Sequence, residues 1–302
     1  MNDASYHMHL SEDADQKAIE DLTKQVKGAR GPMASIIRAR RDQLKIEVEA
    51  ERGFVLALAK ARKSLVELMT MASVSADPEL FMSFTDEQIL DLILRGGLGL
   101  AIDDFVEATT RIRASVEKSL EAVGVDLSPQ AIPQLDLIQQ QATTAVFEDV
   151  ILPDFTKAIK TALRSMSLEI PVEIIKSDLE LQLERATGRQ LTDIKTQISE
   201  YGRSTTAIAS AAAGLEHYLY TGPRDGITRP FCDVLINLVV DEKQMNKLNN
   251  NQGRPVRIAC GGYNCRHSWS PITESFIEAA GLERATSGDI VAANAAAKRK
   301  RR

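Results

Sequence analysis

A long apolar stripe with helical spacing, within residues 33–73, constrains the fold of this chain more than any other feature of its sequence. The stripe consists of Ile37, Leu44, Val48, Val55, Leu58, Leu65 and Met69. Its members are separated by combinations of three and four residues, which predicts one long helix or two nearly continuous ones, with Gly53 as a candidate bend. Because Arg41, Glu51 and Arg62 interrupt the stripe, we expect packing against neighbouring helices and not a regular coiled coil.

Further helices are expected up to residue 215, separated by glycines, prolines and a turn at Ala76-Asp77-Pro78. The segment Thr85-Asp86-Glu87-Gln88 has the form of a capping box that starts a helix. The cluster Gly96-Gly97-Leu98-Gly99 is expected to separate two helices, because it lacks the Lys-Ser/Thr and the preceding strand of a phosphate-binding loop. Prolines at positions 129, 133, 153 and 171 begin or kink further helices. The sequence therefore predicts a mainly α fold, with an elongated helical body over residues 33–215.

The composition limits both the kind of core and the kind of partner. Aromatic residues make up only 5% of the chain, so the core should consist of Leu, Ile, Val and Ala, as in helical assemblies. The net charge of -5 argues against wholesale binding to nucleic acid, because phosphate contacts need a surplus of Lys and Arg. No apolar run approaches the roughly 20 residues that span a bilayer, and the N-terminal segment has no basic start and no apolar signal core. We therefore expect a soluble protein made in the cytoplasm, without membrane contact.

The character of the chain changes after residue 215. Residues 216–275 are rich in Gly, Pro and Asn and contain all three cysteines, which predicts a small α+β module. Strands are expected in the segment HYLYTGP and at residues 234–240 and 256–258. The remaining segments are a polar N-terminal arm, residues 1–32, and a C-terminal helix followed by a basic tail, residues 276–302.

Four side chains of this module are candidate metal ligands: Cys232, Cys260, Cys265 and His267. Zinc favours sulfur and imidazole ligands in a tetrahedron, and a closed structural site supplies cohesion that so small a module lacks. The spacing contains no CxxC pair, so buried thiols beside a hydrogen-bonded His, or a disulfide, remain alternatives. An enzymatic interpretation is a nucleophilic pair, with Cys265 or Cys232 as the nucleophile and His267 or His217 as the base.

The chain ends in five consecutive basic residues: Lys298, Arg299, Lys300, Arg301 and Arg302. This charge predicts either a disordered, solubilising tail or a local contact with nucleic acid or with an acidic partner surface. Five charges release only a handful of counterions, so any binding to DNA should be weak and sensitive to salt.

Within residues 218–272, the runs YTGPRDGITRPFC, NNNQG and GGYNCRHSWSPIT resemble the C-terminal module of phage minor head proteins of the Mu head-morphogenesis type. The matching positions are Asp225, Thr228, Arg229 and Cys232 in the first cluster and Asn264, Cys265, Arg266, His267 and Trp269 in the second. The resemblance covers about 55 of 302 residues. Many relatives have His-Pro-Asn where this chain has Gly262-Tyr263-Asn264, a final Cys at His267, and Gly at Cys260. Because these exchanges preserve the number of sulfur and imidazole side chains, the resemblance favours the zinc interpretation.

The resemblance implies a structural, non-enzymatic protein of the virion, present in few copies in the head or at the portal vertex after assembly in the host cytoplasm. Its partners would be the portal protein, the major capsid protein, or both, and its role would be head assembly or DNA delivery. The helical body matches no motif and fits an assembly element that contacts the portal, the capsid or copies of itself. Two alternatives are a zinc-stabilised DNA-binding packaging factor in weak contact with packaged DNA, and a cysteine hydrolase of the assembly pathway.

Overall fold

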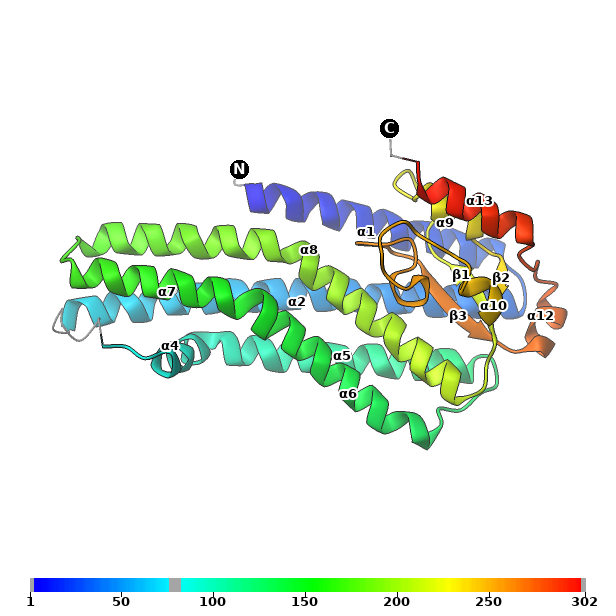
Figure 1. The fold of residues 1–302 in the computed structure, drawn as a ribbon, viewed down its shortest axis with the longest axis horizontal. Helices are drawn as coiled ribbons and strands as arrows, with labels where there is room; N and C mark the ends of the chain where they lie inside the picture. Colours follow the sequence, from blue (N-terminus) through cyan, green and yellow to red (C-terminus); the bar gives the residue numbers. More distant parts are fainter. Residues whose placement is uncertain (1–2, 76–82, 300–302) are drawn as a thin grey trace. The chain divides into compact units, whose positions relative to one another are not determined.

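The computed structural model describes residues 3–75 and 83–299, which are mainly helical (Figure 1). The helices that precede the C-terminal sheet are α1 (Asp3–Gly28), α2 (Pro32–Ser75), α4 (Asp86–Ile93), α5 (Gly99–Glu121), α6 (Ile132–Thr144), α7 (Leu152–Ser167) and α8 (Val172–Ala212). The predicted mainly α fold with a small α+β module near the C-terminus is therefore confirmed. The predicted turn at residues 76–78 lies outside the described residues. None of the described helices is long and apolar enough to cross a membrane.

Helix α2 is continuous and buries most of the apolar stripe that predicted it. The buried members, each at most 4% exposed, are Ile37, Leu44, Leu58, Leu65 and Met69. The helix runs through Gly53 without a break. Gly53 is exposed, and among the described residues nothing beyond the local helix backbone lies within 4 Å of the position that a Cβ would take there.

The start of α4 and its junction with α5 follow the predicted signals. The Thr85 side chain accepts a hydrogen bond from the Gln88 backbone N–H, and the Gln88 side chain accepts one from the Thr85 N–H, which completes the capping box. A π-helical turn, η1 (Leu94–Leu98), then joins α4 to α5. Gly97 in this turn has a φ of 104°, and a Cβ there would lie 3.3 Å from the Cα of Ala61. The glycine cluster thus separates two helices, as predicted.

The described residues group into two compact units, and the predicted helical body contributes to both. The first unit consists of the described parts of residues 1–9, 49–107 and 141–194. Its core contains Phe54, Phe105 and Phe147, whose rings meet edge to face with centroids 5.4 to 5.9 Å apart. Phe147 belongs to η3 (Ala145–Ile151), a π-helical segment between α6 and α7 that ends just before Pro153. The core of this unit therefore contains a cluster of three phenylalanine rings.

The second unit consists of residues 10–48, 108–140 and the described part of 195–302, and it contains a three-stranded antiparallel sheet. The strands β1 (His217–Thr221), β2 (Val239–Asp241) and β3 (Ser268–Ile272) lie in the order β2-β1-β3. His217 pairs with both Asp241 and Ile272. The remaining helices are α9 (Pro230–Leu235), α10 (Glu242–Met245), α11 (Val256–Ala259), α12 (Glu274–Ala280) and α13 (Ser287–Ala297), of which α13 packs against α9 (Figure 1).

The residues of β1 alternate between two cores, as expected for a strand that is covered on both faces. The core that contains Tyr218 and Tyr220 also includes Phe231, Cys232, Leu235, Cys265, Trp269 and Ala293. The core that contains Leu219 also includes Ile36, Val123, Val239, Ile272, Phe276 and Ile277. The second core thus joins the sheet to residues of α2 and of the segment after α5.

Two of the three predicted strands differ from the structure. Residues 256–258 belong to α11, because Pro255 takes the N-cap position and starts a helical turn. The predicted strand over residues 234–240 is divided between the end of α9 and β2, with Asn237 at a φ of 69° between them. The strand β3 was not among the predicted strands.

We expect opposite effects from placing alanine at two glycines of the first unit. Gly97→Ala should lower the free energy of unfolding by about 1–3 kcal/mol, because its backbone is left-handed and Ala61 blocks the Cβ. Gly53→Ala, the matched control in an open helix interior, should raise it by about 0.5–1 kcal/mol. Urea unfolding midpoints of both variants measure this, and equal midpoints would contradict the packing at Gly97.

Candidate metal centre

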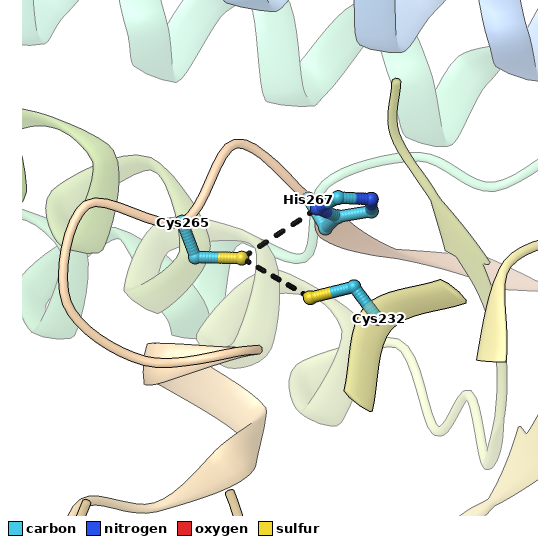
Figure 2. A group of neighbouring side chains, drawn as sticks. All are labelled: Cys232, Cys265 and His267. Atoms are coloured by element: carbon cyan, nitrogen blue, oxygen red, sulfur yellow. Dashed lines mark hydrogen bonds between the residues drawn. The ribbon is translucent and has the colours of Figure 1, made fainter. Parts of the chain in front are cut away.

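Three side chains that are separated in the sequence meet between α9 and the start of β3 (Figure 2). Cys232 comes from α9, Cys265 from the loop after α11, and His267 from the residue before β3. Their candidate ligand atoms all lie within 4.8 Å of one another, and each residue is at most 4% exposed. The structure therefore contains a buried group of side chains that could hold a metal ion.

The two distances from the Cys265 sulfur match those between ligands of a tetrahedral ion. The Cys265 Sγ lies 3.8 Å from the Cys232 Sγ and 3.6 Å from the His267 Nδ1 (Figure 2). Two thiolates bound to one zinc ion at the tetrahedral angle lie roughly 3.8 Å apart, and a thiolate and an imidazole nitrogen lie roughly 3.6 Å apart. Among the described residues, the buried His267 Nε2 has no hydrogen-bond partner.

Neighbouring groups hold the two sulfur atoms in place. The Gly261 N–H donates to the Cys265 Sγ at 3.3 Å, and the Tyr220 hydroxyl donates to the Cys232 Sγ at 3.3 Å. The Tyr220 ring also stacks on His267, with centroids 5.3 Å apart. A Cβ at position 261 would lie 2.2 Å from the Cys232 Sγ, so only glycine fits this close approach.

The two thiols differ in acidity because they share one hydrogen bond. The hydrogen bond from Cys232, with the nearby His267 and Arg203, lowers the pKa of the Cys265 thiol well below its ordinary value. The same hydrogen bond and burial raise the pKa of Cys232 well above its ordinary value. A thiolate is the form that binds a metal ion, and the lowered pKa of Cys265 favours this form.

The fourth predicted ligand, Cys260, lies outside this group. Cys260 is fully buried at the end of α11, with a φ of 50°, and its backbone carbonyl accepts a hydrogen bond from Asn250. Burial raises the pKa of its thiol to about 12, so it stays protonated near neutral pH. The structure thus brings together three of the four predicted side chains.

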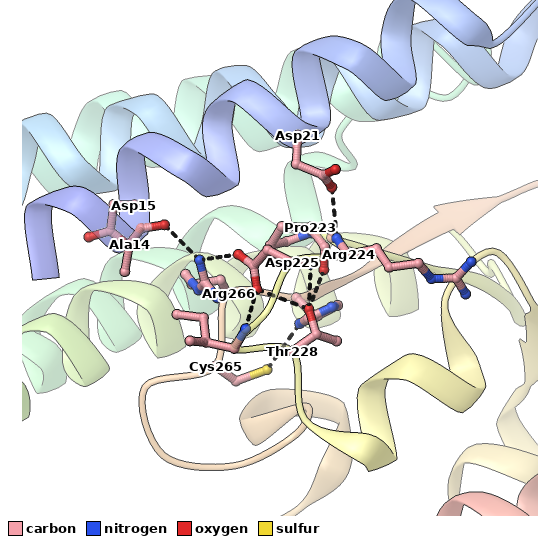
Figure 3. Close-up of polar contacts among 12 residues, drawn as sticks. Ala14, Asp15, Asp21, Pro223, Arg224, Asp225, Thr228, Cys265 and Arg266 are labelled. Carbon is pink, nitrogen blue, oxygen red and sulfur yellow. Dashed lines mark hydrogen bonds and ion pairs between the residues drawn. The ribbon is translucent and has the colours of Figure 1, made fainter. Parts of the chain in front are cut away.

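A partly buried ion pair between Asp225 and Arg266 joins the two sequence clusters (Figure 3). The Arg266 Nη1 lies 2.7 Å from the Asp225 Oδ2, and its Nη2 donates to the Oδ1 at 3.0 Å. The Asp225 Oδ1 also accepts from the Thr228 hydroxyl and from the Ile227 N–H, at 3.1 Å each. Arg266 further donates to the Ala14 carbonyl of α1, at 2.8 Å. This contact therefore ties the loop before β3 to the turn after β1 and to α1.

The remaining motif residues have structural contacts. Arg229 donates to the Tyr263 carbonyl, and the buried Trp269 donates its Nε1–H to the Val256 carbonyl at 3.0 Å. Asn264 adopts a φ of 54°, a conformation that asparagine tolerates better than most residues. Arg229 and Trp269 thus hold backbone segments near the cysteine and histidine group through hydrogen bonds.

Two buried arginines that the sequence analysis missed hold the loop from the other side. Arg203 of α8 donates to the carbonyls of Cys265 and His267, at 2.8 and 3.2 Å. Arg40 of α2 donates to the carbonyl of Arg266 at 2.9 Å. Three consecutive carbonyls are therefore bound by guanidinium groups from two distant helices. In the sequence, Arg203 and Arg40 are recognisable only as charged residues within helices. Such residues more often lie on an exposed face.

Only the first two residues of the predicted basic tail are among the described residues. Lys298 and Arg299 follow α13 and are exposed, whereas residues 300–302 lie outside the described residues. The tail contact with DNA or with an acidic surface stays a prediction.

The Asp225–Arg266 contact predicts a specific pH dependence of stability. Burial alone would raise the pKa of the Asp225 carboxyl, but the hydrogen bond and charge of Arg266 hold it below its ordinary value. The contribution of the ionised carboxylate is therefore complete near neutral pH and is lost as the pH falls below about 4. Asp225→Asn should lower the unfolding free energy by about 2–4 kcal/mol at neutral pH, and this difference should shrink in acid.

Urea unfolding of both proteins between about pH 2 and pH 7 measures this difference. Asp233→Asn is the control, because Asp233 pairs with Arg224 at the surface. This substitution should change the unfolding free energy by at most about 1 kcal/mol. A difference that grows as the pH falls would contradict the assignment.

Comparisons of this chain with protein-family models, with curated proteins and with solved structures found no match.

Proposed function

We propose that this chain is a structural minor head protein of a tailed phage, which acts at the portal or the inner capsid surface in head assembly or in DNA delivery. The single observation that carries the proposal is the convergence of the two sequence clusters that resemble the Mu-type module. Asp225 of the first cluster pairs with Arg266 of the second, and Cys232 of the first meets Cys265 of the second. This arrangement supports a module whose motif residues provide cohesion.

The burial of the cysteine and histidine group favours a structural role over catalysis. A nucleophilic cysteine needs a neighbouring base and also room for a substrate carbonyl beside its sulfur. His267 lies beside Cys265 and could act as the base, but Cys265 is only 4% exposed. The Gly261 N–H and the Cys232 thiol occupy further positions around its sulfur. These contacts suit a Cys265 sulfur that holds neighbouring chain segments together.

We further propose that Cys232, Cys265 and His267 bind a zinc ion. Two sulfur atoms and one imidazole are ligands that zinc prefers, and the two distances from the Cys265 sulfur match those of a tetrahedral ion, whose fourth position would be open to water. When bound, the ion would supply cohesion between α9 and the loop before β3. This support is useful where a loop rich in Gly and Asn has few apolar side chains of its own.

A DNA-binding packaging factor is the second candidate, favoured by the exposed Lys298 and Arg299 at the start of the basic tail. The net charge of -5 restricts any such contact to this segment. The full chain should then be retained on immobilised duplex DNA at low salt, and deletion of residues 298–302 should abolish the retention. Retention that is independent of salt, or unaffected by the deletion, would contradict this candidate.

The location of the protein in the particle tests the leading proposal. We expect mass spectrometry to find the chain in purified virions and in head precursors, in few copies relative to the major capsid protein. Electron cryo-microscopy of particles that carry a tagged chain should place it at the portal vertex or at the inner capsid surface. Absence from both virions and head precursors would contradict the proposal.

The zinc proposal predicts a metal content that depends on two of the three cysteines. The purified protein should contain about one zinc ion per chain by elemental analysis. Cys232→Ser and Cys265→Ser should each weaken zinc binding at least about tenfold. Both variants should also unfold at a lower temperature than the parent protein, since a structural ion stabilises the folded state.

Cys260→Ser is the matched control, because Cys260 is equally buried but lies outside the ligand group. This variant should retain zinc even if it is less stable. A parent protein that is free of metal and whose melting temperature is unchanged by a chelator would contradict the zinc proposal.

A further inference from the structure

Tyr220 touches two of the three candidate zinc ligands. Its hydroxyl donates to the Cys232 Sγ at 3.3 Å, and its ring stacks on His267 with the ring planes 8° apart and the centroids 5.3 Å apart. Tyr220 is fully buried, and Cys232 and His267 are each at most 2% exposed. Among the described residues, the Tyr220 hydroxyl has no hydrogen-bond partner besides Cys232. The side chain therefore meets the candidate metal centre through both its ring and its hydroxyl.

The sheet itself holds Tyr220 in this position. Tyr220 lies in β1 and pairs with Trp269 of β3, and the centroids of the two rings lie 4.4 Å apart. The Tyr220 backbone N–H donates to the Leu238 carbonyl at 3.0 Å, and its carbonyl accepts from the Asn237 N–H at 2.9 Å. Because backbone and ring are both held by neighbouring segments, the hydroxyl is placed beside Cys232 by the fold.

Each of the two cysteine sulfurs accepts a hydrogen bond from outside the ligand group. The donor to the Cys265 Sγ is the backbone N–H of Gly261, whereas the donor to the Cys232 Sγ is the side chain of Tyr220. The core around both cysteines is mainly apolar. A thiolate in such surroundings needs donors that stabilise its charge, and hydrogen bonds to an ionised acceptor are the stronger ones. The donor to Cys232 can be removed by substituting one side chain.

We propose that Tyr220 is a positioning residue of the metal centre, which holds the Cys232 thiolate through its hydroxyl and the His267 imidazole through its ring. This inference rests on the proposed zinc site and adds a residue outside the ligand set that raises its affinity for the ion. Partners of metal ligands commonly change metal affinity by about 10- to 100-fold. Cysteine, histidine and carboxylate side chains are the usual zinc ligands, so the hydroxyl acts as a donor to a ligand and not as a fourth ligand.

Tyr220→Phe tests the hydroxyl, because it keeps the ring that stacks on His267. The full-length variant should bind zinc about tenfold more weakly than the parent protein, measured in competition with a chromophoric chelator. Tyr218→Phe is the matched control, because Tyr218 is similarly buried in the same strand and the same core, but its hydroxyl donates to the Leu215 carbonyl. This variant should keep the affinity of the parent protein.

Cobalt(II) in place of zinc gives a signal that a simple loss of stability would not change. A hydrogen bond to a metal-bound sulfur lowers the energy of the sulfur lone pairs. Its removal in Tyr220→Phe should therefore shift the sulfur-to-cobalt charge-transfer band to longer wavelength. The band of Tyr218→Phe should stay at the position of the parent protein.

A crystal structure of the zinc-loaded parent protein needs no variant. The Tyr220 hydroxyl oxygen should lie within hydrogen-bond distance of the Cys232 Sγ and outside the coordination sphere of the ion. An oxygen at about 2.0–2.2 Å from the ion would make Tyr220 a ligand, and a hydroxyl that points away from the sulfur would leave it without a role. Either result would overturn the proposal.

The outcomes distinguish this inference from the zinc proposal on which it rests. A parent protein that binds no zinc contradicts both. If the parent protein binds zinc but Tyr220→Phe has equal affinity or an unshifted cobalt band, the zinc site stands and the role of Tyr220 is overturned.

Discussion

The backbone of residues 265–267 depends on hydrogen bonds from two buried arginines, and the C-terminal unit is arranged around that contact. These residues precede β3, so their carbonyls need donors from outside the strand ladder. A guanidinium group suits this task because it presents several donors in a fixed plane. Arg203 and Arg40 supply them from α8 and α2. Burial of two positive charges is the consequence, and Glu47 forms an ion pair with Arg40.

This contact explains why the change in composition after residue 215 does not mark an independently packed module. The loop that carries Cys265 is fixed by helices that lie more than 60 residues earlier in the chain. The sheet shares a core with Ile36 of α2 and with Val123, and Arg266 reaches the Ala14 carbonyl of α1. Residues 10–48, 108–140 and the described part of 195–302 accordingly form one compact unit. The Gly- and Asn-rich segment thus obtains from these helices the apolar surface that it lacks.

Local signals were predictable from the sequence, whereas contacts between distant segments were not. The stripe of α2, the capping box at Thr85 and the break at Gly97 each depend on neighbouring residues, and all three were identified. The residue types of the candidate metal centre were also identified, because cysteine and histidine are rare in this chain. The separation of Cys260 from the other ligands depends on its backbone conformation after α11, which spacing alone does not reveal. Arg203 was missed because a helical arginine becomes informative only when its burial is known.

Arg203 also connects the candidate metal centre to α8. It donates to the carbonyls of Cys265 and His267, so it holds the backbone that carries two of the three candidate ligands. A zinc ion bound by two thiolates and one neutral imidazole would have no net charge. The proposed ion would therefore stabilise this short segment through its side chains, whereas Arg203 stabilises it through its carbonyl groups.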